Sequence, residues 1–316
     1  MLVAFLWGGT FLVVRLAMDV SGPFFFVGLR FLCAAAAIAF LFRSSLRGMD
    51  VHEVVAGTAI GVGIFVGYGL QCYGLQTIAS SKSAFISALY MPLVPLLQWG
   101  LMRLKPHLMS WLGIVLAFVG LILLAGPEMT DAGLSFGFGE MITAIGTLGI
   151  AVEVVLISFF AKAVDIRRVT VVQLLTASLL GFACMPVFGE RVPAMSGYLI
   201  ASACALGIMS AFIQLAMNWA QRHVSPTRAT LIYAGEPVWA GILGRVAGER
   251  LPGLAILGGV LVLAGVLVSE LRPRRHQPVS CSRLSQASSR RSASLPHSQP
   301  GSSPPAGRCR AESRYP

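Results

Sequence analysis

Ten long apolar segments occupy most of this chain, and they limit how it can fold more than any other feature. Each is close to the ~20 residues that an α-helix needs to cross the hydrocarbon core of a bilayer. The segments are 1–18, 24–42, 54–76, 83–102, 108–125, 138–161, 170–188, 196–220, 228–246 and 252–271. Backbone polar groups in lipid must be hydrogen-bonded internally, and these runs lack the alternation of barrel strands, so they predict transmembrane helices.

The composition agrees with a membrane protein. Apolar residues make up 56% of the chain and charged residues 12%, whereas about a quarter of the residues are charged in soluble domains. The mean hydropathy is +0.77. Of the net charge of +11, +8 lies after residue 271, where nine arginines accompany one acid, so the charge gives no support for nucleic-acid binding. We predict an all-α polytopic membrane protein.

The chain also repeats itself at a spacing of 145 residues, which lays 68–124 over 213–269. The matched pairs are Gln76 with Gln221, Ser80 with Ser225, Ala84 with Ala229, Pro92 with Pro237, Gly113 with Gly258 and Gly120 with Gly265. Each half of the chain contains five predicted helices. Because this number is odd, the two halves cross the membrane in opposite orientations. The sequence therefore predicts ten transmembrane helices in two inverted five-helix repeats, 1–126 and 134–271, a design that recurs in secondary transporters.

Lysine and arginine are distributed unequally between the loops of the two membrane sides. With the N-terminus in the cytoplasm, twelve lie on the cytoplasmic side and four on the other. Because cytoplasmic loops carry the basic excess in membrane proteins, we predict a multi-pass inner-membrane protein with both termini cytoplasmic. Segment 272–316 holds eleven serines and seven prolines but few apolar residues, so it is predicted to be a disordered basic tail.

Matched prolines point to a substrate site, because interrupted helices of two inverted repeats commonly form one near the bilayer midplane. Pro92 and Pro237 are therefore predicted helix breaks. Polar side chains are costly in hydrocarbon, so we expect those of the segments to line a cavity; hydrogen bonding between helices alone is the alternative. The candidate substrate-binding residues are Trp7, Arg30, Tyr68, Gln71, Tyr90, Glu153, Gln214, Asn218, Tyr233 and Glu236.

Three of these candidates carry a charge inside a predicted helix: Arg30, Glu153 and Glu236. A charge at the bilayer centre costs about 2.5–3.5 kcal/mol on insertion scales, so each is a candidate for contact with substrate or with a coupling proton. Glu236 is matched in the first repeat by Met91, so a symmetric scaffold does not require an acid there. A salt bridge that locks one conformation is the alternative role.

Motifs of other function classes are absent from the sequence. It has no phosphate-binding loop, no cysteine or histidine spacing of a metal site, and no catalytic triad or HExxH arrangement. We therefore predict no cofactor, no metal and no enzymatic activity, with energy supplied by an ion or substrate gradient. The predicted partners are a small-molecule substrate and the lipid bilayer, without nucleic acid, and a homodimer is left open.

Several short motifs resemble EamA-type members of the drug/metabolite transporter superfamily. They are Leu6-Trp7-Gly8-Gly9-Thr10-Phe11, Leu29-Arg30-Phe31, Gly235-Glu236-Pro237-Val238, Gly248-Glu249-Arg250-Leu251, Gly258-Gly259 and Gly265. The resemblance covers 1–271 and implies two inverted repeats around a central cavity, with transport of small metabolites, frequently the export of amino acids. It places Trp7, Arg30 and the stretch Glu236-Pro237 at or near the cavity. The first half departs from the family pattern at 103–106, which contains no acid where one is expected.

We therefore predict a secondary transporter of small polar metabolites, an exporter of amino acids or related compounds that works by alternating access. Arg30 is expected to meet a carboxylate, and Glu236 or Glu153 an amine or a proton. A multidrug or cation exporter is the first alternative, because buried acids and aromatic rings would serve a cation. A non-transporting scaffold or receptor that acts through 272–316 is the second.

Overall fold

The computed structural model describes residues 2–18, 20–78, 83, 86–87, 89–103, 105, 108–125, 137–233, 235–236, 239 and 253–270. Regular structure in these residues is helical, and a helix overlaps each of the ten predicted segments, which confirms the all-α class. The helices are α1 (Leu2–Met18), α2 (Pro23–Leu41), α3 (Val51–Gly74), α5 (Tyr90–Met102), α6 (Leu108–Ala125), α8 (Phe138–Phe160), α9 (Ile166–Cys184), α10 (Gly197–Ala220), α11 (Pro226–Tyr233) and α13 (Gly253–Glu270). Of these, α2, α3, α8, α9 and α10 are long and apolar enough to cross a membrane.

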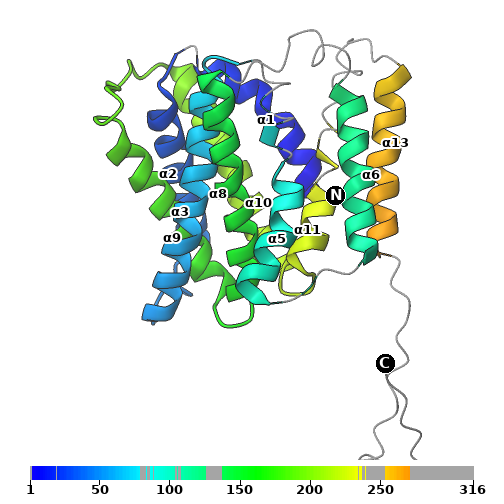
Figure 1. The fold of residues 1–316 in the computed structure, drawn as a ribbon. Helices are drawn as coiled ribbons and strands as arrows, with labels where there is room; N and C mark the ends of the chain where they lie inside the picture. The colour runs from blue at the N-terminus through cyan, green and yellow to red at the C-terminus, as the bar shows by residue number, and fades with distance from the viewer. Residues whose placement is uncertain are drawn as a thin grey trace, which may run out of the picture. The chain divides into compact units, whose positions relative to one another are not determined.

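Helices related by the shift of 145 residues make equivalent contacts. Helix α3 packs against α8 and α9, and its equivalent α10 packs against α1 and α2. The equivalent helices α2 and α9 pack against each other, and so do α6 and α13, which lie side by side in Figure 1. The described helices therefore follow an approximate twofold arrangement.

Contacts between α6 and α13 show that the two copies run in opposite directions. A Cβ atom added to Gly120 would lie 2.6 Å from the carbonyl oxygen of Gly258, and one added to Gly265 would lie 2.5 Å from that of Gly113. Residue numbers thus rise along α6 as they fall along α13, so the two helices are antiparallel. Because they are the fifth helices of their copies, the repeats are inverted, as the sequence predicts.

Helix α3 brings both α8 and α9 close to itself through glycines on two of its faces. Gly57 and Gly61 face α9, and a Cβ atom on Gly61 would lie 2.5 Å from the carbonyl oxygen of Gln173. Gly63 and Gly67 face α8 in the same way. Small residues let transmembrane helices approach to backbone contact. The contact fixes the two helices that carry much of the site described below.

Two glutamates link the repeats at opposite ends of the antiparallel pair α2 and α9. Glu190, in the loop after α9, accepts hydrogen bonds from the backbone N–H groups of Phe24 (3.1 Å) and Phe25 (3.0 Å) in the first turn of α2. Helix α2 has no cap from its own side chains, so Glu190 satisfies donors that the helix leaves free. At the other end, Glu53 accepts from the N–H of Asp165, just before α9, at 3.1 Å and pairs with Arg168 at 3.1 Å.

Replacing Glu190 with alanine is expected to lower the free energy of unfolding by about 0.5–2 kcal/mol, the usual effect of losing a helix cap. The neighbouring Arg191 is exposed, so Arg191→Ala serves as the matched control and should have little effect. Thermal unfolding of the two purified variants in detergent micelles measures the difference. Equal melting temperatures for Glu190→Ala and wild type would show that the cap contributes nothing.

The fourth and ninth predicted segments are interrupted at nearly equivalent positions. In the first repeat a turn at Leu89, whose N–H donates to the carbonyl of Ile86 at 3.1 Å, precedes α5. In the second, α11 ends at Tyr233 and a turn follows at Gly235. Pro92 lies in the first turn of α5, where a missing N–H leaves no helical bond unmade. Pro237 and the predicted tail 272–316 lie outside the described residues.

Candidate transport site

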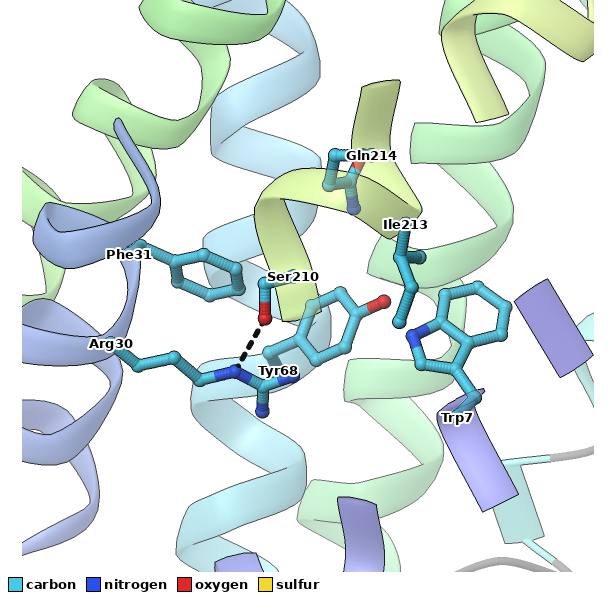
Figure 2. Close-up of a pocket in the computed structure, with 7 residues that line it drawn as sticks. All are labelled: Trp7, Arg30, Phe31, Tyr68, Ser210, Ile213 and Gln214. Carbon is cyan, nitrogen blue, oxygen red and sulfur yellow. Dashed lines mark hydrogen bonds between the residues drawn. The ribbon is translucent and has the colours of Figure 1, made fainter. Parts of the chain in front are cut away.

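A small pocket lies where the two repeats meet. Figure 2 shows its lining, which comes from α1, α2 and α3 of the first repeat and from α10 of the second. The lining residues are Trp7, Arg30, Phe31, Tyr68, Ser210, Ile213 and Gln214. Tyr68 and Ile213 are equivalent under the 145-residue shift, so both repeats present the same position to the pocket. Its empty space is about 160 Å³, including space open to its surroundings, and it leaves no room for a water molecule.

Arg30 is the charged residue of this lining, and its side chain is 3% exposed. Its Nε donates to the hydroxyl oxygen of Ser210 at 2.8 Å (Figure 2), while the guanidinium carbon lies 5.5 Å from the ring centre of Phe31 and 5.8 Å from that of Tyr68. Cation–π contacts are worth about 0.5–2 kcal/mol each. Among the described residues, no carboxylate forms an ion pair with Arg30.

A chain of amides leads from the pocket to Glu153 on α8. The Nε2 of Gln214 donates to Oε1 of Glu153 at 2.7 Å. The Oε1 of Gln214 in turn accepts from Nε2 of Gln173 on α9 at 2.8 Å. Asn218, one turn along α10, donates to Oε1 of Gln173 at 3.2 Å and to the hydroxyl oxygen of Thr170 at 3.1 Å. All five side chains are buried. Each amide donates toward the carboxylate, so the chain is oriented to stabilise a negative charge on Glu153.

Aromatic rings and a second acid complete the surroundings. Trp7 meets Tyr233 of α11 edge to face, with ring centres 5.4 Å apart. Glu236, half-buried after the turn at Gly235, acts electrostatically on the phenols of Tyr68 and Tyr90, as Glu153 does. Within the described residues Glu236 has no hydrogen bond or ion pair. The site thus combines one cation with two acids and several rings.

The structure brings together most of the residues singled out from the sequence. Trp7, Arg30, Tyr68 and Gln214 line the pocket, and Glu153 and Asn218 belong to the amide chain. Tyr233, Tyr90 and Glu236 lie near them, as the ring contact and the electrostatic interactions show. Gln71 instead donates to the hydroxyl oxygen of Ser87 at 2.6 Å.

Three polar residues of the site were missed. Ser210 lies four residues before Gln214 and so extends the polar face of α10 that also carries Asn218, a signal that the spacing contains. Gln173 and Thr170 are the polar residues of α9 that meet this face, and both are fully buried. Their role depends on how α9 packs against α10, which residue spacing within one helix does not give.

Four of the polar residues of the site have an apolar counterpart in the other repeat. Under the 145-residue shift Glu153, Gln173 and Gln214 fall on glycines, which are Gly8, Gly28 and Gly69, and Arg30 falls on Leu175. In the first repeat Gly28 instead serves helix packing, since an added Cβ atom would lie 2.8 Å from the ring of Phe182. The scaffold is therefore symmetric, whereas the site is not.

An all-helical polytopic fold whose inverted repeats meet at a charged pocket is typical of membrane transporters. The chain belongs to the EamA-like transporter family, whose family model matches residues 1–126 and 137–271. Members of this family are transporters and not enzymes, and they belong to the drug/metabolite transporter superfamily named from the motifs above.

Individual relatives agree with this assignment. The chain is 28% identical over 276 residues to the uncharacterized inner membrane transporter YedA of Escherichia coli K12, covering 84% of this chain and 87% of the relative. It is 25% identical over 154 residues to the S-adenosylmethionine/S-adenosylhomocysteine transporter of Chlamydia muridarum, covering 46% of this chain and 48% of the relative. A solved crystal structure shares the fold with a TM-score of 0.68 at 21% identity, covering 87% of this chain and 98% of that one.

Proposed function

We propose that this protein is a secondary transporter that moves small polar metabolites by alternating access, as an exporter of amino acids or related compounds. The observation that carries the proposal is the position of the charged pocket between the inverted repeats, with lining residues from both. The pocket leaves no room for a water molecule, so it must widen before any metabolite can enter. Movement of one repeat against the other would open it to each side in turn.

The charges and rings of the site favour an amino-acid-like substrate. Arg30 suits a carboxylate, Glu153 or Glu236 suits an amine or a coupling proton, and Trp7 and Tyr68 supply ring faces. The relative from Chlamydia muridarum is named for S-adenosylmethionine, an amino-acid derivative that also carries an aromatic base. Since the sequence has no nucleotide-binding motif, an ion or substrate gradient is the proposed energy source.

The remaining features of the proposal follow the sequence. We place the protein in the inner membrane, with both termini in the cytoplasm because of the basic residues of that side's loops. The two proposed transport repeats are 1–126 and 134–271, and 272–316 is the predicted disordered basic tail.

A multidrug or cation exporter is the second candidate, favoured by the two acids and the aromatic rings. Arg30 opposes it, because a buried guanidinium in the same pocket repels a cationic substrate. Flux of lipophilic cations in proteoliposomes, without flux of amino acids, would favour this candidate over ours.

Glu236 provides the test of the proposal. In proteoliposomes, Glu236→Gln is expected to lower amino-acid flux about tenfold or more, because the carboxylate that would meet an amine or a proton is lost. Flux should be measured against a panel of amino acids at several pH values, with Glu236→Asp as the matched control that keeps the charge. If Glu236→Gln leaves both the rate and its pH dependence unchanged, Glu236 is not part of the site.

A further inference from the structure

We propose that Arg30 is the anion-binding residue of the pocket and that the substrate must carry a carboxylate, which supplies the counter-ion that this guanidinium lacks among the described residues. The inference rests on the proposed function and specifies its substrate class. It excludes decarboxylated amines and esters as good substrates.

Most N–H donors of Arg30 have no hydrogen-bond partner among the described residues. Of its three guanidinium nitrogens, Nε donates to Ser210, and no hydrogen bond from Nη1 or Nη2 reaches any described residue. Four N–H donors of the planar fork therefore stay available at a side chain that is 3% exposed and lines the pocket. The rings of Phe31 and Tyr68 favour a cation there but do not neutralise it.

The second step compares Arg30 with the acid of the amide chain. Glu153 already accepts a hydrogen bond from Gln214, which Gln173 in turn holds in place. Among the described residues, Arg30 donates to the neutral hydroxyl of Ser210 and to no carboxylate. Of these two buried charges, the cation has the greater need of a partner, so the ligand that fills the pocket should bring a negative group.

The geometry of the guanidinium then selects the kind of anion. Nε is already engaged with Ser210, so the two Nη groups remain as an edge that carries parallel N–H donors. A carboxylate matches two parallel N–H donors of such an edge.

The asymmetry of the repeats gives the substrate a single orientation. The position equivalent to Arg30 is Leu175, which is 40% exposed and lies away from the pocket lining. Arg30 is therefore the one cation in the described lining, and a substrate cannot bind it in two orientations related by the twofold. The acids Glu153 and Glu236 are left for the opposite end of the substrate.

Binding to purified wild-type protein in detergent micelles tests the inference independently of transport. The probes are amino acids, each paired with its methyl ester and with the amine formed by its decarboxylation, and phosphorylated amines form a separate arm. We expect thermal stabilisation by the amino acids at concentrations about tenfold or more below those needed for the paired amines and esters. Equal stabilisation by acid and amine, no stabilisation by any carboxylate, or a preference for phosphates would overturn the inference.

Variants separate anion binding from a structural role. Arg30→Gln removes the charge but keeps a donor near Ser210, so we expect a folded protein that has lost the preference for the free carboxylate. Ser210→Ala keeps the charge and loses the hydrogen bond, so it should keep the preference with weaker binding. If Arg30→Gln retains the preference, Arg30 only joins α2 to α10 and the inference fails. Amino acids that bind but are not carried in proteoliposomes would instead contradict the proposed function.

Discussion

Replacing Gly265 with alanine is expected to separate α13 from α6 and to lower the free energy of unfolding by about 1–3 kcal/mol. The added Cβ atom would lie 2.5 Å from the carbonyl oxygen of Gly113 and 2.9 Å from the backbone nitrogen of Ala117. Neither backbone atom can rotate away as a flexible side chain would, so the helices must move apart and lose contact along their length.

Gly100 supplies the matched control for this substitution. It also lies in a helix, but a Cβ atom there would meet nothing within 4 Å. Gly100→Ala should therefore be neutral or stabilising, since alanine favours the helix by up to about 1 kcal/mol. Unfolding of the two variants in detergent by heat measures the contrast. If both variants melt alike, the close contact of α6 with α13 does not stabilise the fold.

Replacing Glu153 with glutamine is expected to lower transport about tenfold or more while leaving the protein folded. The glutamine can still accept the hydrogen bond from Gln214, so the amide chain is kept, but the charge toward which its donors point is lost. A charge-assisted hydrogen bond is worth about 1.5–3 kcal/mol, which corresponds to roughly 10- to 150-fold in binding. The measurement is the initial rate of flux in proteoliposomes.

The same substitution elsewhere on α8 controls for the loss of an acid. Glu140 lies in the first turn of that helix, outside the pocket lining, so Glu140→Gln should retain flux. Equal rates for Glu153→Gln and wild type, with both proteins folded, would remove Glu153 from the transport site and leave the amide chain a structural role.

The helices could be predicted from the sequence because their cause is local. A continuous apolar run of sufficient length has few alternatives to a transmembrane helix, and α6 and α13 begin and end within one residue of the predicted bounds. Inversion also followed from the sequence, because a repeat with an odd number of spans must reverse. The exact interruptions could not be predicted: the turns at Leu89 and Gly235 depend on packing and do not coincide with the prolines.

Site residues could be predicted where the residue type itself is unusual for an apolar segment. Arg30 and Glu153 stand out because a charge in an apolar segment is costly, and both are buried beside polar partners. Gln173 gave no such signal, because an uncharged amide on α9 acquires its role only through contact with Gln214 on α10. The repeat itself also helps, since Gln173 falls on Gly28 under the shift of 145 residues and so differs from it in polarity.

Solute counterflow in proteoliposomes tests the central claim most directly, because only a carrier whose site faces each side in turn drives it. Vesicles that contain purified protein are loaded with an unlabelled amino acid and diluted into a trace of the same labelled compound. The account predicts that the labelled amino acid accumulates transiently above its external concentration, and that Arg30→Gln abolishes this accumulation. Simple equilibration without accumulation, or no uptake above that of protein-free vesicles for any amino acid, would contradict it.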